Sequence, residues 1–166
     1  MEKVAHFSKV SFEEFKQAFR HEDEARAREI YDSIKVPARA TKGSAGYDFF
    51  SPYYVKLWPG ESVKIPTGIR VQIDDGWSLN IFPRSSLGFK YRVQLDNTVG
   101  IIDQDYYYSD NEGHIFVKIT NDSLNDDAVE INAGDKFVQG IFMSYGITYE
   151  DDATGVRNGG MGSTGA

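Results

Sequence analysis

The residues of this chain whose types and spacing are best suited to chemistry lie in one stretch, from Asn97 to Tyr106. An amide, a glycine and a β-branched apolar run precede two carboxylates and a ring. Side chains alternate along a strand, so Val99, Ile101 and Asp103 share one face, and the apolar strand can hold Asp103 rigidly at its end. Gly100 lets another group approach the backbone closely. We therefore expect a site that reads a flat ring with main-chain groups and aims a carboxylate at a nearby bond, with a core strand that ends in a solvated turn as the alternative interpretation.

A second stretch, from Pro83 to Gly88, has the composition of a phosphate site. Arg84, Ser85 and Ser86 would supply planar guanidinium donors, hydroxyl donors and free backbone N–H groups, which are the groups that bind phosphate. The alternative is a loop whose serines cap their own backbone.

Three further stretches contain groups of the same kind. The C-terminal stretch from Arg157 to Gly165 combines Arg, Ser and Thr with many glycines. It predicts a flexible clamp that wraps a polyphosphate with backbone and hydroxyl donors, with a disordered terminus as the alternative. The other two are turns that enter strands: Ala45 to Asp48 ends in a carboxylate, and Gly134 to Gln139 ends in an amide.

The elements that must position these groups are short strands. From Val36 onward, apolar and polar residues alternate in runs separated by turns rich in Pro, Gly, Asp and Asn. The runs are 63–65, 69–73, 79–81, 115–119 and 129–131. Many short strands at regular spacing predict an all-β sandwich, barrel or jelly roll.

Residues 1–35 follow a different pattern. Ser11 and Glu14 form a capping-box signature, and three phenylalanines follow at helical spacing. The alternating acids and arginines of residues 22–29 are typical of an exposed helix. We expect one amphipathic helix from about Ser11 to Tyr31, packed on the body of the protein or on a neighbouring subunit; a partner-binding role is the less favoured interpretation.

The composition excludes several classes of function. A chain of 166 residues is long enough for one domain with a real core, and its net charge of −7 argues against general nucleic-acid binding, although a few local cations could still hold a small anion. The absence of cysteine excludes disulfides and thiolate chemistry and makes a cytoplasmic location the simpler expectation. No apolar run could span a bilayer, and no signal-peptide pattern opens the chain. His6, His21 and His114 are far apart and match no zinc-site spacing.

Taken together and in this order, the five stretches resemble the motifs of the trimeric dUTP diphosphatase (dUTPase) family, of a bacterial or phage type. The resemblance runs from about Ala38 to the C-terminus. It implies a jelly roll, which is a distorted β-barrel, over residues 36–150, and a symmetric homotrimer with three active sites. Residues 1–35 are then an added N-terminal helical extension, and residues 151–166 are a flexible glycine-rich arm that closes a neighbouring subunit's site.

The resemblance also implies a reaction. dUTP and water would give dUMP and pyrophosphate, which keeps uracil out of DNA and supplies dUMP for thymidylate synthesis. Asp103 matches the carboxylate that holds and activates the attacking water as a general base. Mg²⁺ is expected to bind the triphosphate and keep several waters, rather than to occupy a protein cage.

The other site residues are implied by the same resemblance. Backbone groups of Gly100, Ile101 and Ile102 and the amide of Asn97 would read uracil, and Tyr106 matches the ring that packs under the sugar and would clash with a ribose 2′-hydroxyl. The residues expected to bind the phosphates are Arg84, Ser85, Ser86 and Gln139. The arm residues expected to touch the substrate are Arg157, Met161, Gly162, Ser163 and Thr164. Asp48 matches a carboxylate that supports the motif arginine and the waters around the metal.

The chain departs from the family pattern in two places. Met161 stands where the family usually has an aromatic residue that stacks on uracil, so we expect weaker ordering of the arm over the base, with the chemistry intact. The tyrosine-rich insertion, from Tyr107 to His114, lengthens the turn after the third motif. We favour a longer loop with packed rings over an interaction surface.

Two alternative functions stay open. A dCTP deaminase shares the fold and the serine-rich motif, but it uses a glutamate as its catalytic acid–base where this chain has Asp103, so this alternative is remote. The other is a regulatory nucleotide-binding protein that also binds a repressor, as some phage members of the family do. The N-terminal helix and the tyrosine-rich insertion are the segments that would serve such a partner, and we expect neither membrane association nor direct nucleic-acid binding.

Overall fold

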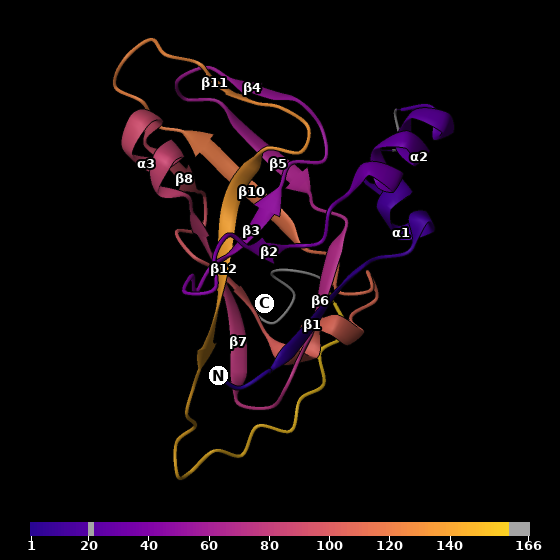
Figure 1. Cartoon of the computed structure of the whole chain (residues 1–166). Helices are drawn as coiled ribbons and strands as arrows, with labels where there is room; N and C mark the ends of the chain where they lie inside the picture. The colour runs from indigo at the N-terminus through magenta and orange to yellow at the C-terminus, as the bar shows by residue number, and fades with distance from the viewer. Residues whose placement is uncertain (20–21, 160–166) are drawn as a thin grey trace.

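A computed structural model describes residues 1–19 and 22–159 of the chain. Strands dominate the molecule (Figure 1), which confirms the all-β expectation. The largest sheet has five strands in the order β2-β3-β12-β7-β9. Their bounds are β2 (Ala38–Arg39), β3 (Tyr47–Phe50), β12 (Lys136–Ser144), β7 (Trp77–Pro83) and β9 (Gly100–Ile102).

Three smaller sheets complete the β body. One has β10 (Phe116–Asn121) between β5 (Ser62–Pro66) and β8 (Val93–Leu95), another pairs β11 (Val129–Ile131) with β4 (Val55–Leu57), and the third pairs β1 (Ala5–Lys9) with β6 (Ile69–Ile73). The strand pairs are antiparallel. Antiparallel sheets can turn one face to the core and the other to water, which is what the alternating sequence predicts.

The apolar positions of these strands form one hydrophobic core. Ile69, Val71 and Ile73 of β6 are 1%, 1% and 3% exposed. Gln72, which lies between two of them, is exposed. Burying an aliphatic side chain of this size stabilises the fold by about 1.5–3 kcal/mol relative to leaving it in water. The two-residue period that predicted the strands is therefore also the period of burial.

The N-terminal region differs from the single helix expected between Ser11 and Tyr31. It contains β1 and two short helices, α1 (Phe12–Gln17) and α2 (Glu24–Ser33). A second helix begins because the carboxylate of Asp23 accepts hydrogen bonds from the backbone N–H groups of Ala25 and Arg26. The prediction of one helix was wrong, since a run of acids and arginines does not reveal which acid is a cap.

The aromatic stripe of this region packs on the body of the protein, as expected. Phe12 and Phe15 are 7% and 0% exposed, and the ring of Phe15 lies against the backbone at Gly68. β1 lies along β6, with Phe7 opposite Val71. The first residues of the predicted helical extension thus belong to a sheet, a pairing between segments far apart in sequence that no local pattern could reveal.

The helices lie at the sides of the β body. α1 and α2 lie together on one side, whereas α3 (Ser85–Tyr91) lies on the other (Figure 1). The 3-10 helix η1 (Gln104–Tyr108) follows β9. Within the described residues, no helix is both long enough and apolar enough to cross a membrane.

Candidate active site

A cavity of about 550 Å³ lies beside β9, in the stretch expected to read a flat ring. Asn97, Gly100, Ile102 and Tyr106 line it, together with residues of β5, β8 and β10. The structure therefore brings together four of the residues that were expected to bind the nucleoside.

The strand geometry of β9 determines which groups reach this cavity. Ile102 faces it, whereas the side chain of Ile101 is 60% exposed and faces outward, so Ile101 can offer only its backbone. Gly100 allows β9 to lie close to β7, because a Cβ atom at this position would be 3.2 Å from Cβ of Ile81. Asp103 follows directly after β9, and its side chain is 52% exposed. The carboxylate thus stands at the end of the strand, in contact with water.

The ring of Tyr106 is held firmly in the cavity wall. Tyr106 is 2% exposed, and its hydroxyl donates a hydrogen bond to the carbonyl oxygen of His114 at 2.6 Å. The same hydroxyl accepts a hydrogen bond from Nδ2 of Asn111 at 2.9 Å. Burial raises the pKa of Tyr106, so the phenol stays neutral and keeps its donor proton. Because the ring is fixed, it forms a rigid part of the cavity wall and could limit the size of a sugar bound beside it.

A second group of site residues, the Asp48 cluster (Asp48, Arg84, Lys136 and Gln139), joins three of the sequence stretches. Oδ1 of Asp48 lies 3.1 Å from Nε of Arg84, and Oδ2 lies 2.8 Å from Nζ of Lys136. Gln139 is opposite Asp48 in the β3–β12 pair, and its Nε2 donates a hydrogen bond to the carbonyl oxygen of Pro83 at 3.3 Å. Asp48 is 6% exposed, and a carboxylate so buried needs its two cationic partners.

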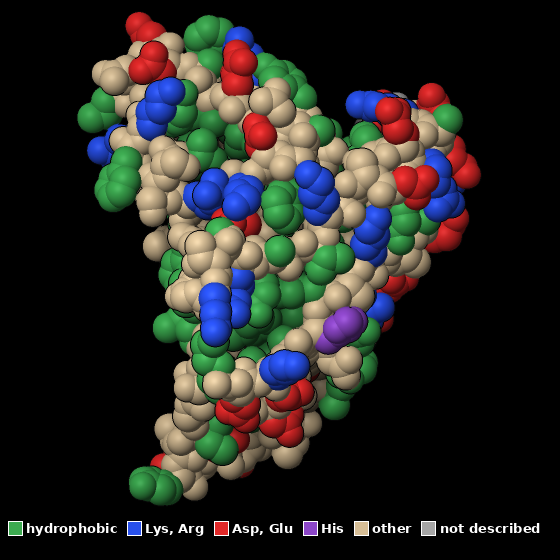
Figure 2. All heavy atoms as spheres, viewed as in Figure 1, with side chains coloured by type: hydrophobic (Ala, Val, Ile, Leu, Met, Phe, Trp, Pro, Cys, Tyr) green, Lys and Arg blue, Asp and Glu red, His purple; other side chains and the backbone are tan. Residues whose placement is uncertain are grey.

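The residues around the Asp48 cluster complete a cationic, donor-rich surface. Ser85 and Ser86 open α3 and are exposed, and Ser85 shares a shallow pocket with Arg84. Figure 2 shows Lys and Arg side chains gathered across the middle of one face, although the net charge of the chain is −7. Lys136 was missing from the predicted site. Its position at the entry to β12 was the only sequence signal, because its partner Asp48 comes from another strand.

Asp103 and the Asp48 cluster lie at opposite ends of β7. Ile102 pairs with Leu79, so Asp103 comes beside the start of β7, whereas Arg84 follows its last residue. At about 3.3 Å per residue the backbone positions of Asp103 and Arg84 are separated by roughly 20 Å along the strand. A single chain therefore brings the predicted residues together as two groups and not as one.

Arg157, the first residue expected on the arm, lies beside the nucleoside cavity of its own chain. Its guanidinium contacts Oδ2 of Asp103 at 2.5 Å and Oδ1 of Asp105 at 2.9 Å, and it lies 5.7 Å from the centre of the Tyr106 ring. A guanidinium bound to two carboxylates neutralises charge at the end of β9. The other predicted arm residues, Met161, Gly162, Ser163 and Thr164, lie outside the described residues.

In the tyrosine-rich insertion the ring of Tyr107 is packed, whereas Tyr108 is 69% exposed, so the choice between a longer loop and an interaction surface stays a prediction. The ring of Tyr107 lies 3.7 Å from the guanidinium carbon of Arg70 and meets the ring of Tyr108 edge-on at 5.1 Å. His114, at the end of the insertion, is 0% exposed. Burial lowers the pKa of His114 to about 4, so the imidazole is neutral at pH 7.

Comparisons with known proteins identify the family that the chain resembles. The model of the dUTPase family matches residues 32–165. A deoxyuridine 5′-triphosphate nucleotidohydrolase of Lactococcus lactis is 42% identical over 136 residues, which cover 80% of this chain and 89% of the relative. The enzyme of the same name from Shewanella baltica is 38% identical over 144 residues, covering 82% and 90%.

Solved structures show the same fold. The crystal structure of dUTPase from Streptococcus mutans superposes with a TM-score of 0.64 at 33% identity, covering 86% of this chain and 97% of that one. The dUTPase of Staphylococcus bacteriophage 80alpha superposes with a TM-score of 0.63 at 18% identity, covering 93% and 98%. The bacteriophage match supports the fold alone. The chain described here belongs to the dUTPase family.

Proposed function

We propose that this protein hydrolyses dUTP to dUMP and pyrophosphate, which keeps uracil out of DNA and supplies dUMP for thymidylate synthesis. The observation that carries the proposal is the cavity beside β9, lined by Asn97, Gly100, Ile102 and Tyr106, with Asp103 at the end of the same strand. The bacterial relatives at 42% and 38% identity, both named dUTP nucleotidohydrolases, support the same activity.

In this proposal the nucleoside enters the cavity beside β9. Backbone groups of residues 100–102 and the amide of Asn97 read the edge of uracil, where a 5-methyl group finds no room. The ring of Tyr106 packs under the deoxyribose and excludes a 2′-hydroxyl. The 2% exposure of Tyr106 and its two hydroxyl hydrogen bonds support this role, because a ring held in this way cannot yield to a larger sugar.

Asp103 is the proposed general base. Its carboxylate positions a water molecule and takes a proton from it as the water oxygen attacks the α-phosphorus; the bond to the leaving pyrophosphate then breaks. Negative charge develops on the phosphate oxygens in the transition state. Hydrogen-bond donors that are already positioned around these oxygens therefore lower the activation barrier. Arg84, Ser85, Ser86 and Gln139 are the proposed phosphate donors. Asp48 keeps Arg84 oriented, and the 3.1 Å contact between the two supports that role.

The distance between the two groups of residues supports a homotrimer whose sites are shared between chains. One triphosphate cannot use Asp103 and Arg84 of the same chain across roughly 20 Å of strand. We propose that each site takes its nucleoside cavity from one chain and its Asp48 cluster from a second. We propose that the arm, with Arg157, Met161, Gly162, Ser163 and Thr164, closes the site from a third chain. This requires Arg157 to leave the carboxylates of Asp103 and Asp105, which it contacts in its own chain.

Mg²⁺ is the proposed cofactor, held by the triphosphate and water. Phosphate and water oxygens are ligands that Mg²⁺ prefers, and within the described residues no three His, Cys, Asp or Glu side chains converge. When bound, the ion neutralises charge on the phosphates. The dUTPase of phage phi11 is described with a structural Mg(II) ion, which is a property of that protein.

The test is pyrophosphate release in the presence of Mg²⁺ from dUTP, dTTP, dCTP and UTP in parallel, for the wild type and Asp103→Asn. Release from dUTP alone, lost in the variant, is the expected result. Equal release from UTP and dUTP would refute the role of Tyr106, and ammonia release from dCTP would indicate the deaminase.

The deaminase and repressor-binding alternatives are less well supported than dUTP hydrolysis. The residue at the end of β9 is Asp103 and not the glutamate of a deaminase. The N-terminal region and the tyrosine-rich insertion, which were the proposed surface for a repressor, contact each other within the chain. A repressor partner stays a prediction from the sequence, and so does a cytoplasmic location.

A further inference from the structure

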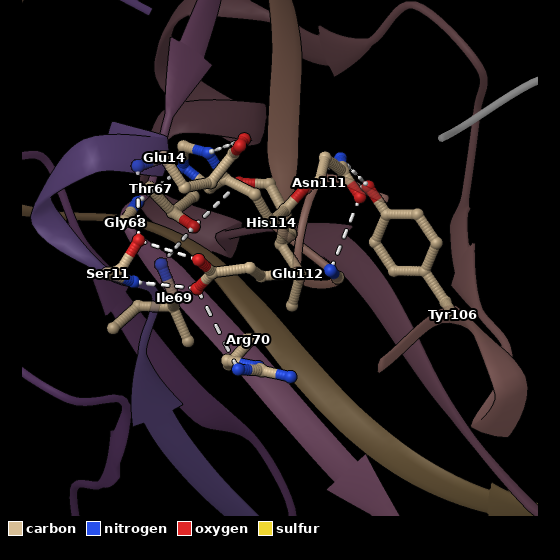
Figure 3. Close-up of polar contacts among 12 residues, drawn as sticks. Ser11, Glu14, Thr67, Gly68, Ile69, Arg70, Tyr106, Asn111, Glu112 and His114 are labelled. Carbon is tan, nitrogen blue, oxygen red and sulfur yellow. Dashed lines mark hydrogen bonds and ion pairs between the residues drawn. The ribbon is translucent and has the colours of Figure 1, made fainter. Parts of the chain in front are cut away.

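The turn from Asn111 to His114 links the N-terminal region to the nucleoside cavity (Figure 3). On its outer side, the carboxylate of Glu112 accepts two hydrogen bonds from Ser11, one from the backbone N–H at 2.8 Å and one from the hydroxyl at 2.6 Å. Arg70 lies 3.8 Å from the same carboxylate. Ser11 is also the N-cap of α1, so the start of this helix is joined directly to the turn.

On its inner side, the same turn holds the hydroxyl of Tyr106. Both partners of that hydroxyl, Nδ2 of Asn111 and the carbonyl oxygen of His114, belong to the turn. Asn111 also lines the nucleoside cavity. The position of the Tyr106 ring therefore depends on the conformation of the turn.

The backbone of the turn adopts an unfavourable conformation, which other contacts must stabilise. Glu112 has a φ of 57°, in the left-handed region that side chains with a Cβ atom rarely adopt. Gly113 follows with a φ of 71°, and a Cβ atom there would lie 2.8 Å from the carbonyl oxygen of Tyr106. A residue in this region persists only when its surroundings hold it there. The bonds from Ser11 hold Glu112 from outside the turn.

A second contact fixes the other end of the turn. Nε2 of His114 accepts a hydrogen bond from the backbone N–H of Gly68 at 3.0 Å. Its Nδ1 lies 3.4 Å from Oε1 of Glu14, a residue of α1. α1 thus contacts the turn at both Glu112 and His114.

We propose that Ser11 and Glu112 are positioning residues for the sugar pocket, through which the N-terminal region sets the discrimination between deoxyribose and ribose. The inference rests on the proposed function, because it needs Tyr106 to meet the sugar. It assigns a role to Ser11, which precedes the part of the chain matched by the dUTPase family model, residues 32–165. Loss of the Ser11–Glu112 contact would relax the turn, free the Tyr106 hydroxyl and open room for a 2′-hydroxyl.

The experiment compares the full-length wild type with Ser11→Ala, Ser11→Thr, Glu112→Gln and Asp23→Ala. The ratio of kcat/KM for dUTP to kcat/KM for UTP is measured for each, together with the Kd of dUDP and UDP by calorimetry. Asp23→Ala is the matched control, because it also removes a helix N-cap, that of α2, whose hydrogen bonds run to Ala25 and Arg26 and not to the turn.

The ratio is expected to fall on the order of fivefold to tenfold in Ser11→Ala and Glu112→Gln. Ser11→Ala removes the hydroxyl hydrogen bond to Glu112, and Glu112→Gln replaces the carboxylate with an amide that has one acceptor oxygen, so each variant weakens the contact that holds the turn. It is expected to stay at the wild-type value in Asp23→Ala and to return toward it in Ser11→Thr. An unchanged ratio in both turn variants, or an equal fall in Asp23→Ala, overturns the inference. Failure of the proposed function is a separate result: the wild type itself would then hydrolyse no dUTP and bind dUDP no better than UDP.

Discussion

Because Arg84 and Asp103 are far apart in one chain, we predict that the inactive variants Arg84→Ala and Asp103→Asn regain dUTP hydrolysis when they assemble into mixed trimers. Arg84→Ala keeps the carboxylate at the end of β9, and Asp103→Asn keeps the Asp48 cluster. Because each site is proposed to take these groups from different chains, some sites of a mixed trimer contain both intact groups. A site built within one chain could never regain both.

The size of the effect follows from counting chains. In trimers assembled at random from equal amounts of the two variants, the chain that supplies Asp103 is intact about half the time, and so is the chain that supplies Arg84. About one quarter of the sites are then complete, and activity should reach about 25% of wild type. Each variant alone should retain on the order of 1% or less, since the loss of a general base or of a phosphate clamp costs about 100-fold.

The assay is pyrophosphate release from dUTP after the two variants are expressed together at equal levels. Mixing Arg84→Ala with Asp48→Ala is the matched control, because the structure puts both residues in the Asp48 cluster of one chain, where Oδ1 of Asp48 lies 3.1 Å from Nε of Arg84. This mixture should stay inactive. A mixture of Arg84→Ala and Asp103→Asn as inactive as its components, or equal recovery in the control, would refute the shared site.

Three further predictions concern single residues. Asp103→Asn should lower kcat on the order of 100-fold or more with little change in KM for dUTP, because it removes the proton acceptor and keeps the shape; steady-state kinetics with an unchanged kcat would contradict the role. Gly140→Ala should lower the free energy of unfolding by about 1–3 kcal/mol, because its Cβ atom would lie 2.8 Å from Cδ1 of Leu79 in the core; an unshifted denaturant midpoint is the opposing result. Lowering the pH from 7 to 5 should cost about 2 kcal/mol of stability through His114, since burial lowers its folded pKa to about 4 from an ordinary value of 6.5. The unfolded chain then binds more protons below pH 6.5, so the stability present above that pH is lost as the pH falls toward 4, and His114→Gln should reduce the loss in denaturation at the two pH values. Burial raises the pKa of Glu14, which acts in the opposite direction and makes the comparison with His114→Gln necessary.

The sequence predicted the β body well because burial in a strand repeats every second residue. Val117 and Ile119 are 2% and 0% exposed, as their alternation with polar residues indicates. The N-terminal region was harder to predict, because its organisation depends on one helix N-cap and on one strand pairing between distant segments. Asp23 begins a second helix within what reads as a continuous helical pattern, and β1 forms only because β6 is there to bond it.

The candidate site was predicted as residues but not as a geometry. Asp48, Arg84 and Gln139 were each identified from their own stretch. The structure brings them together with Lys136, which lies in the same stretch as Gln139 but was not predicted as a site residue. The tyrosine-rich insertion shows the same limit. Its sequence indicated packed rings, whereas the contact of Glu112 with Ser11 depends on where the N-terminal region docks.

The sequence by itself determined the alternating strands after Val36, the reactive groups and the family, because side-chain alternation and motif order are properties of neighbouring residues. Only the tertiary structure decided which of these groups meet. The registers that join β7 to β9 and to β12 leave Asp103 and Arg84 at opposite ends of one strand. The docking of α1 connects Ser11 to the turn that holds Tyr106. Both outcomes depend on contacts between segments far apart in the chain, whose energies arise only when the whole core is packed.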